Sequence, residues 1–417
     1  MERYSEYKDS GVKWLGEIPS HWEVKRLGSF FFERKEKVSD KDYAPLSVTK
    51  QGIFPQLENV AKTNDGDNRK LVKDGDFVIN SRSDRKGSSG VSGLDGSVSL
   101  INIVLQPRKV LFGPFCNYLL KSYGFIEENY RNGRGIVADL WTTRYDEMKM
   151  IKVAMPSFEE QKNISSYLDA ATSKIDKAIA MQQKMIDLLN ERKQIIIQNA
   201  VTKGLDENVE MKDSGVEWIG MIPKHWGLYP LRKYLNVNSK RNMPNAQLLS
   251  VTREEGVIVR NTESKEENHN FIPDDLSNYK YVRKGQFVIN KMKSWQGSYG
   301  VSNFNGIVSP AYFVYDLNYP NTTYFSMAIR SKMFSPFFSK YSKGIRIDQW
   351  DLVPEALKVI PFLEPPVEEQ IEIVEYLGNL IPKIESKISN CQRQIALLQE
   401  RKQIIINEVV TGKVKVS

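Results

Sequence analysis

Two loops that are rich in glycine, serine and basic residues carry the most distinctive chemistry of this chain. The first is Ser81–Gly90 and the second is Lys291–Ser298. Arginine can donate two parallel hydrogen bonds to guanine in the major groove, and small neighbouring residues let a loop approach a phosphate backbone closely. The loops and later basic positions in each half are therefore predicted to contact DNA, the alternative being a solvated surface. The candidate residues are Arg82, Arg85, Lys86, Arg131, Arg134, Lys291, Lys293, Lys343 and Arg346.

The sequence offers little for catalysis. It contains no glycine-rich phosphate-binding loop and no Asn-Pro-Pro-Tyr-like methylation motif. Metal-dependent nucleases require Pro-Asp followed by Glu-x-Lys, but Glu263-Ser264-Lys265 precedes Pro273-Asp274, and Glu385-Ser386-Lys387 lies in the second helical segment, where side chains two residues apart diverge. Two cysteines and three histidines cannot build a Cys/His metal cluster. His21 and His225 precede tryptophans at matched positions, which favours a packing role over a catalytic one. We therefore expect neither a catalytic residue nor a metal ligand on this chain.

An internal repeat spans nearly the whole chain. Lys8–Val12 recurs as Lys212–Val216, and Phe77–Asn80 recurs as Phe287–Asn290. The offset drifts along the chain, so loops have gained and lost residues while the structural elements were kept. A repeat of this length indicates two duplicated domains rather than a solenoid.

The longest exact repeat closes two segments with helical periodicity. Glu191–Ile197 returns unchanged as Glu400–Ile406, which is 209 positions later. The helical segments run from 159 to about 200 and from 368 to about 410. Isolated helices of this length are marginal in water, so each apolar face needs a partner. The other copy is the simplest partner.

Apolar residues spaced four and three apart define the faces that are expected to pack. A neighbouring stripe, which includes Ile179 and Ile186, widens the face of the first helix. Pro382 lies inside the second helix, where a kink or short break is expected because proline removes one backbone hydrogen bond. The predicted interface residues are Leu168, Ile175, Met185, Leu189, Ile196, Leu377, Ile384, Leu398 and Ile405.

Composition sets the remaining bounds. The chain has 417 residues, 41% of them hydrophobic and 26% charged, so two to three soluble domains are expected. Its N-terminus has no apolar signal core, and no apolar run of about 18 residues occurs, which predicts a cytoplasmic protein. The net charge of +8 favours nucleic acid as a partner.

Together these motifs resemble the specificity (S) subunit of type I restriction-modification systems. The resemblance rests on the Lys-Asp-Ser-Gly-Val…Trp…Ile-Pro…His-Trp lead, the Phe-Val-Ile-Asn strand, and the Pro…Glu-Glu-Gln entry to a helix ending in Glu-Arg-Lys-Gln-Ile-Ile. It covers both halves of the chain. In that family two target recognition domains each read one half of a split DNA site, and two spacer helices pack antiparallel between them.

The resemblance also implies partners and cofactors. Double-stranded DNA with a bipartite site, two methylation subunits and restriction subunits would be the partners, with no membrane. Catalysis would lie on those other subunits, which would hold S-adenosylmethionine, ATP and Mg²⁺, and this chain would carry no cofactor. The base-reading loops vary freely in the family, so the resemblance does not identify individual contact residues.

The resulting prediction is a pseudo-two-fold α/β protein with two duplicated recognition domains separated by two long antiparallel, coiled-coil-like helices. The expected parts are a first recognition domain at 1–157, a spacer helix at 158–201, a linker at 202–212, a second recognition domain at 213–366 and a second spacer helix at 367–411. The expected function is to direct a restriction-modification complex to its DNA site. Two alternatives stay open: a self-contained DNA nuclease or methyltransferase, and a coiled-coil scaffold without a DNA role.

Overall fold

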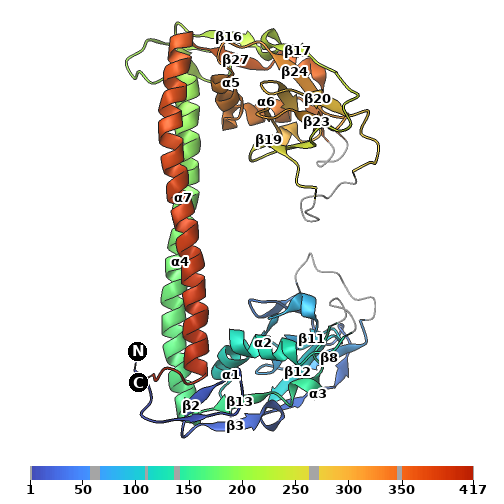
Figure 1. Cartoon of the computed structure of the whole chain (residues 1–417), viewed down its shortest axis with the longest axis vertical. Helices are drawn as coiled ribbons and strands as arrows, with labels where there is room; N and C mark the ends of the chain where they lie inside the picture. Colours follow the sequence, from blue (N-terminus) through green and yellow to red (C-terminus); the bar gives the residue numbers. More distant parts are fainter. Residues whose placement is uncertain are drawn as a thin grey trace. The chain divides into compact units, whose positions relative to one another are not determined.

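The chain forms two compact units in a computed structural model (Figure 1). Unit 1 comprises Met1–Gln183 with Gln392–Ser417, and unit 2 comprises Lys184–Cys391. The long helices α4 (Phe158–Lys203) and α7 (Val367–Val410) each contribute one part to both units. The division into recognition domains, spacer helices and linker stays a prediction. The structure describes residues 2–56, 66–108, 111–135, 141–262, 272–344 and 350–416.

Unit 1 is built on a four-stranded antiparallel sheet. In spatial order its strands are β10 (Ser89–Val91), β9 (Phe77–Asn80), β12 (Asn102–Pro107) and β4 (Phe31–Glu33). Phe77 and Ile79 face the main core of the unit, whereas Val78 faces a smaller core on the other side of the sheet. Burial on both faces explains why this strand is a continuous apolar run rather than an alternating one.

The other elements of unit 1 flank this sheet. The strands are β1 (Tyr7–Asp9), β2 (Glu17–Pro19), β3 (Glu23–Arg26), β5 (Lys37–Val38), β6 (Leu46–Val48), β7 (Ile53–Pro55), β8 (Arg69–Val72), β11 (Gly96–Val98) and β13 (Lys152–Met155). The helices are η1 (Leu27–Ser29), η2 (Ser83–Arg85), α1 (Gly113–Leu120), α2 (Tyr123–Arg131) and α3 (Tyr145–Met148).

Unit 2 repeats the same sheet. Its order is β17 (Leu235–Val237), β24 (Phe313–Leu317), β21 (Phe287–Ile289) and β22 (Tyr299–Val301). Phe77 of unit 1 pairs with Val91 and Leu105. Phe287 of unit 2 pairs with Val301 and Tyr315. Each of these three positions is shifted by 210, so the two sheets share one register.

The remaining elements of unit 2 are also short strands and helices. The strands are β14 (Met211–Asp213), β15 (Met221–Pro223), β16 (Gly227–Pro230), β18 (Leu249–Thr252), β19 (Gly256–Val259), β20 (Lys280–Val282), β23 (Gly306–Val308), β25 (Ser342–Lys343), β26 (Asp351–Leu352) and β27 (Pro361–Glu364). The helices are η4 (Leu231–Tyr234), η5 (Ser294–Gln296), α5 (Thr322–Ile329), η6 (Lys332–Phe334), α6 (Ser335–Lys340) and η8 (Pro354–Lys358).

Segments of α4 and α7 pack against each other inside each unit. In unit 1 the beginning of α4, with Ile164 and Leu168, shares a core with Ile405 and Val409 near the end of α7. In unit 2 the end of α4 shares a core with the beginning of α7. The helices therefore run antiparallel, as Figure 1 also shows.

Matched ion pairs accompany this packing. Lys402 lies 2.7 Å from Asp176 in unit 1, and Lys193 lies 3.2 Å from Glu385 in unit 2. Both lysines belong to the exact repeat, and both acids occupy matched positions. Each pair is partly exposed, so its contribution is small and it serves mainly to favour one register.

The middle of the helix pair differs from the sequence prediction at two places. Met185 was expected to pack in the interface but is 49% exposed, whereas Ile186 of the neighbouring stripe is only 7% exposed. The cause is the drift of a 3.6-residue period away from a seven-residue repeat. Of the kink or short break expected at Pro382, the break is absent: α7 continues through this residue as one helix. Pro382 and Gly378, whose carbonyl loses its donor, both lie on the exposed side, where water can replace the missing hydrogen bond.

Each long helix is tied at its first turn to the tryptophan-rich lead of its unit. Glu160 contacts His21 Nε2 at 2.9 Å and accepts from Trp22 Nε1 at 3.3 Å. Glu369 makes the same two contacts with His225 and Trp226. Both tryptophans are almost fully buried. This arrangement gives the two histidines a structural role.

Burial alone would raise the pKa of Glu160, but hydrogen bonds from His21 and Trp22 outweigh it and hold the pKa below its ordinary value of 4.5. A carboxylate whose pKa is depressed on folding stabilises the folded state above its unfolded pKa. That contribution disappears as the pH falls through the folded pKa.

No helix among the described residues is both long enough and apolar enough to cross a membrane.

We predict that Glu160→Gln lowers the free energy of unfolding by about 1 kcal/mol at pH 7, since a partly exposed carboxylate loses its paired contacts. The difference from wild type should vanish as the pH is lowered below the pKa of Glu160. Urea unfolding across this pH range measures the effect, and Glu159→Gln, an exposed change one residue away, is the control. Equal stability of Glu160→Gln and wild type at pH 7 would contradict the prediction.

Candidate nucleic-acid interface

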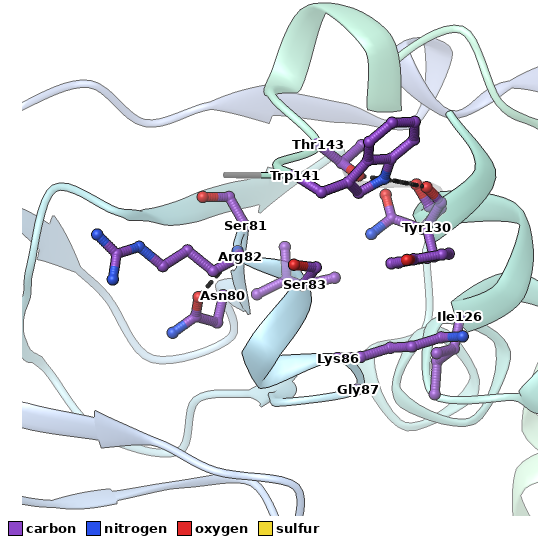
Figure 2. Close-up of a pocket in the computed structure, with 12 residues that line it drawn as sticks. Asn80, Ser81, Arg82, Ser83, Lys86, Gly87, Ile126, Tyr130, Trp141 and Thr143 are labelled. Atoms are coloured by element: carbon purple, nitrogen blue, oxygen red, sulfur yellow. Dashed lines mark hydrogen bonds between the residues drawn. The ribbon is translucent and has the colours of Figure 1, made fainter. Parts of the chain in front are cut away.

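A hollow in unit 1 gathers the first basic loop and two aromatic side chains (Figure 2). The loop follows β9. The other walls of the hollow come from α2 and from the segment that begins at Trp141. We call this feature the unit 1 hollow. Its lining residues are Ile79, Asn80, Ser81, Arg82, Ser83, Lys86, Gly87, Ile126, Asn129, Tyr130, Trp141 and Thr143.

Backbone hydrogen bonds hold the basic positions together. Thr142 forms isolated antiparallel bridges to Arg82 on one side and to Arg134 on the other. The Arg134 amide donates to the Thr142 carbonyl at 2.8 Å, and the Ser83 amide donates to the Trp141 carbonyl at 3.1 Å. Two arginines that are distant in sequence are thus fixed on either side of one short extended segment.

The aromatic side of the hollow is equally ordered. Trp141 Nε1 donates to the Tyr130 carbonyl oxygen at 2.8 Å, and the two ring centroids are 6.0 Å apart. A side chain at Gly133 would place its Cβ 2.4 Å from Trp141 Nε1, so glycine is required for this packing. Lys86 Nζ lies 4.4 Å from the centre of the Tyr130 ring. Figure 2 shows Lys86 extending toward Ile126 and Tyr130, while Arg82 points the opposite way.

Ion pairs separate the basic candidates of unit 1 into two groups. Four of them have a carboxylate neighbour: Arg85 with Asp84 at 3.6 Å, Lys86 with Glu127 at 2.7 Å, Arg131 with Glu128 at 2.5 Å, and Arg134 with Glu147 at 3.2 Å. Within the described residues, the exposed guanidinium of Arg82 has no ion-pair partner. A neighbouring acid offsets the positive potential that attracts a phosphate or a base acceptor. Arg82 is therefore the strongest single candidate for an anionic or acceptor-rich ligand.

Asn129 adds an unused acceptor to the hollow. The residue is only 9% exposed, and among the described residues its Oδ1 atom has no hydrogen-bond donor. Leaving a buried acceptor unpaired is unfavourable by roughly 1–3 kcal/mol, so a ligand donor or a bound water would stabilise this site.

Unit 2 places different residues in the corresponding region. The Lys291 ammonium pairs with Asp351 at 2.8 Å, and the Leu352 amide donates to the Lys291 carbonyl at 2.9 Å. Trp295 and Trp350 have ring centroids 5.4 Å apart, and within the described part Trp295 Nε1 has no acceptor.

Two of the three other basic candidates of unit 2 lie on exposed, described segments. Lys293 and Lys343 are exposed and have no ion-pair partner in the described part of the unit. Arg346 lies outside the described residues.

The site residues predicted from the sequence do not include the aromatic residues of these two regions. Trp141 and Trp350 are 209 positions apart, and each follows a Gly-Ile pair by the same number of residues. That match was visible without a structure. Their partners, Tyr130 and Trp295, lie on different elements of the two units, so only the structure reveals the two aromatic pairs as counterparts.

The described residues show no group of three or more His, Cys, Asp or Glu side chains arranged to hold a metal.

Comparison with known proteins finds relatives along nearly the full length of the chain. The type I restriction enzyme MjaVIII specificity subunit of Methanocaldococcus jannaschii is 24% identical over 441 residues, covering 98% of this chain and 97% of the relative. The putative type I restriction enzyme MjaX specificity subunit of the same organism is also 24% identical, over 453 residues and 98% of each chain. No family model matches the chain.

A solved structure supports the fold. It comes from work on the complex assembly and conformational transition of the type I R-M system, and one chain of it superposes with a TM-score of 0.66. The identity is 14%, and the match covers 95% of this chain and 99% of the other. At this identity the similarity shows a shared fold.

We predict that Arg82→Ala weakens binding to the preferred duplex by about 1–3 kcal/mol, as loss of one base-reading arginine does. Arg131→Ala removes the same side chain at an exposed position that is already paired with Glu128, and should change affinity by no more than about 0.5 kcal/mol. Fluorescence anisotropy with a labelled duplex at fixed salt compares the two variants. Equal losses of affinity in the two variants would contradict the prediction, because they would show that an arginine with an ion-pair partner contributes as much to binding as Arg82.

Proposed function

We propose that this chain, which resembles type I restriction enzyme specificity subunits over nearly its whole length, is the subunit that reads a split DNA site. Its role is to direct methylation and restriction subunits to that site. The observation that carries the proposal is the contrast between a shared framework and unlike loops. The two four-stranded sheets have the same register, whereas the loops after β9 and β21 differ in sequence and side-chain chemistry.

Different loops on one framework suit the reading of two different half-sites. The unit 1 loop offers the exposed guanidinium of Arg82, which is without an ion-pair partner among the described residues, between Ser81 and Ser83, and guanidinium groups pair well with guanine. The unit 2 loop offers Met292 and Lys293 beside Trp295, and the unit 1 loop has no methionine or aromatic residue. An arginine and a lysine make different base contacts, so the recognised half-sites should be unlike.

Reaction chemistry belongs to other chains in this proposal. Two methylation subunits and restriction subunits would bring S-adenosylmethionine, ATP and Mg²⁺, and the complex would act in the cytoplasm. The leads of the two units are matched, each being held to a long helix by Glu160 or Glu369, and two copies of one partner would bind at these matched places.

The rival functions make different demands. A self-contained methyltransferase would bind S-adenosylmethionine without partners, and a self-contained nuclease would cut DNA as a purified chain. A coiled-coil scaffold would show no salt-dependent affinity for duplex DNA.

The test is selection of bound duplexes from a randomised pool by the full chain, followed by sequencing. We expect enrichment of two short, unlike sequences separated by an unread gap of constant length, with affinity that falls as salt rises. Equilibrium dialysis of the same chain with labelled S-adenosylmethionine should show no retention. Enrichment of one continuous sequence, or no enrichment at all, would contradict the proposal.

A further inference from the structure

Arg330 connects two loops of unit 2 through their backbone carbonyls. It follows α5, and its side chain is half-buried. Nη1 donates to the Tyr299 carbonyl at 2.7 Å and to the Gly297 carbonyl at 3.4 Å. Nη2 donates to the carbonyls of Arg253 and Glu254, at 2.8 and 2.6 Å. One guanidinium thus contacts four backbone oxygens.

The four oxygens belong to two separate segments. Arg253 and Glu254 form the turn between β18 and β19, which we call the 252–256 turn. Gly297 lies near the end of the basic loop between β21 and β22, which also carries Lys293 and Trp295, and Tyr299 is the first residue of β22. Arg330 therefore fixes the loop that the proposed function assigns to base reading against a neighbouring turn.

Two glycines make this close approach possible. A Cβ at Gly300 would lie 3.3 Å from Gly256 Cα, and a Cβ at Gly256 would lie 3.1 Å from Arg330 Nη1. Gly256 also has a φ of +77°, which disfavours other residues. Unit 1 has the same backbone contact, because a Cβ at Gly90 would lie 3.1 Å from Gly52 Cα. The turn thus packs on the strand in both units.

What differs between the units is the side chain that holds the turn. The residue matched to Arg330 is Lys121, which is 209 positions earlier in the sequence Leu-Lys-Ser in place of Ile-Arg-Ser. Within the described part of unit 1 no hydrogen bond or ion pair is formed by the Lys121 ammonium. Asn117 Oδ1 accepts from the Val91 amide at 3.2 Å, which is a contact with strand β10 and not with the turn. A lysine ammonium lacks the planar fork needed to span four carbonyls.

We propose that Arg330 is the positioning residue of the unit 2 recognition loop, and that the half-site read by unit 2 depends on it while the half-site read by unit 1 does not depend on Lys121. The inference rests on the proposed function. The donors of the Arg330 guanidinium bind protein carbonyls, so this residue acts through the loop and does not itself contact DNA. Its loss frees the carbonyls of the loop and the turn, and the base-reading side chains then sample more than one position.

The experiment compares Arg330→Met, which keeps the length of the side chain but removes its donors, with Arg330→Lys, the residue of the matched position. Lys121→Met in unit 1 is the control. Full-length variants are subjected to the same duplex selection, and preference is scored separately for each half-site. Arg330→Met should reduce the preference for the unit 2 half-site about tenfold, comparable to the loss of one good base contact. The preference for the unit 1 half-site and the salt dependence of binding should not change. Arg330→Lys should retain only part of the wild-type preference for the unit 2 half-site.

A second readout does not require DNA. Hydrogen exchange of the free chain should become faster at residues 252–256 and 291–299 in Arg330→Lys, with unit 1 unaffected. If wild type selects no DNA sequence, the proposed function fails, and the exchange data still decide whether Arg330 holds the loop. Unchanged half-site preference and unchanged exchange in a folded Arg330→Lys variant would overturn the inference, as would an equal loss of preference in Lys121→Met.

Discussion

Packing of α4 against α7 is the interaction on which both units depend. A single helix of this length is marginally stable in water, because its apolar face has no partner. In unit 1 the partner of Ile164 and Leu168 comes from the far end of the chain, at Ile405 and Val409. These side chains belong to the same core as the buried Trp22, so the helix pair and the sheet-bearing part of the unit are stabilised together. Closing such a distant contact is entropically unfavourable, and continuous apolar burial offsets that loss.

The same framework leaves the surface loops free to differ. Strand register, the glycine contact beneath the turn, and the Glu-His-Trp clamp at the helix entry all occur twice. The residues that hold or line the loops are not shared: Lys121 stands at the position matched to Arg330, and Tyr130 of unit 1 packs on Trp141 where Trp295 of unit 2 packs on Trp350. The two units share their buried backbone geometry and differ in their exposed side chains. Two domains that recognise different DNA sequences require this arrangement.

The sequence predicted the features that arise from repetition and periodicity. The two helices, their mutual packing and the duplicated apolar strand follow from patterns that are strong enough to override local context. Details that depend on small free-energy differences were not predictable, such as the exposure of Met185 and the continuity of α7 through Pro382. The sequence also did not predict which surface arginines form ion pairs. Arg82 and Arg131 are both basic candidates, and only the structure places Glu128 beside Arg131. The role of Arg330 needs the three-dimensional course of two loops that no local pattern encodes.

Each unit is held together by segments from both long helices. Hydrogen exchange measured by mass spectrometry on a Leu168→Ala variant tests it most directly. Truncation of this fully buried residue should destabilise unit 1 by about 2–5 kcal/mol. Protection should fall in residues 392–410 as much as in 158–183, while residues 184–391 should keep the protection of wild type. Loss of protection throughout α4, with the end of α7 unaffected, would contradict it.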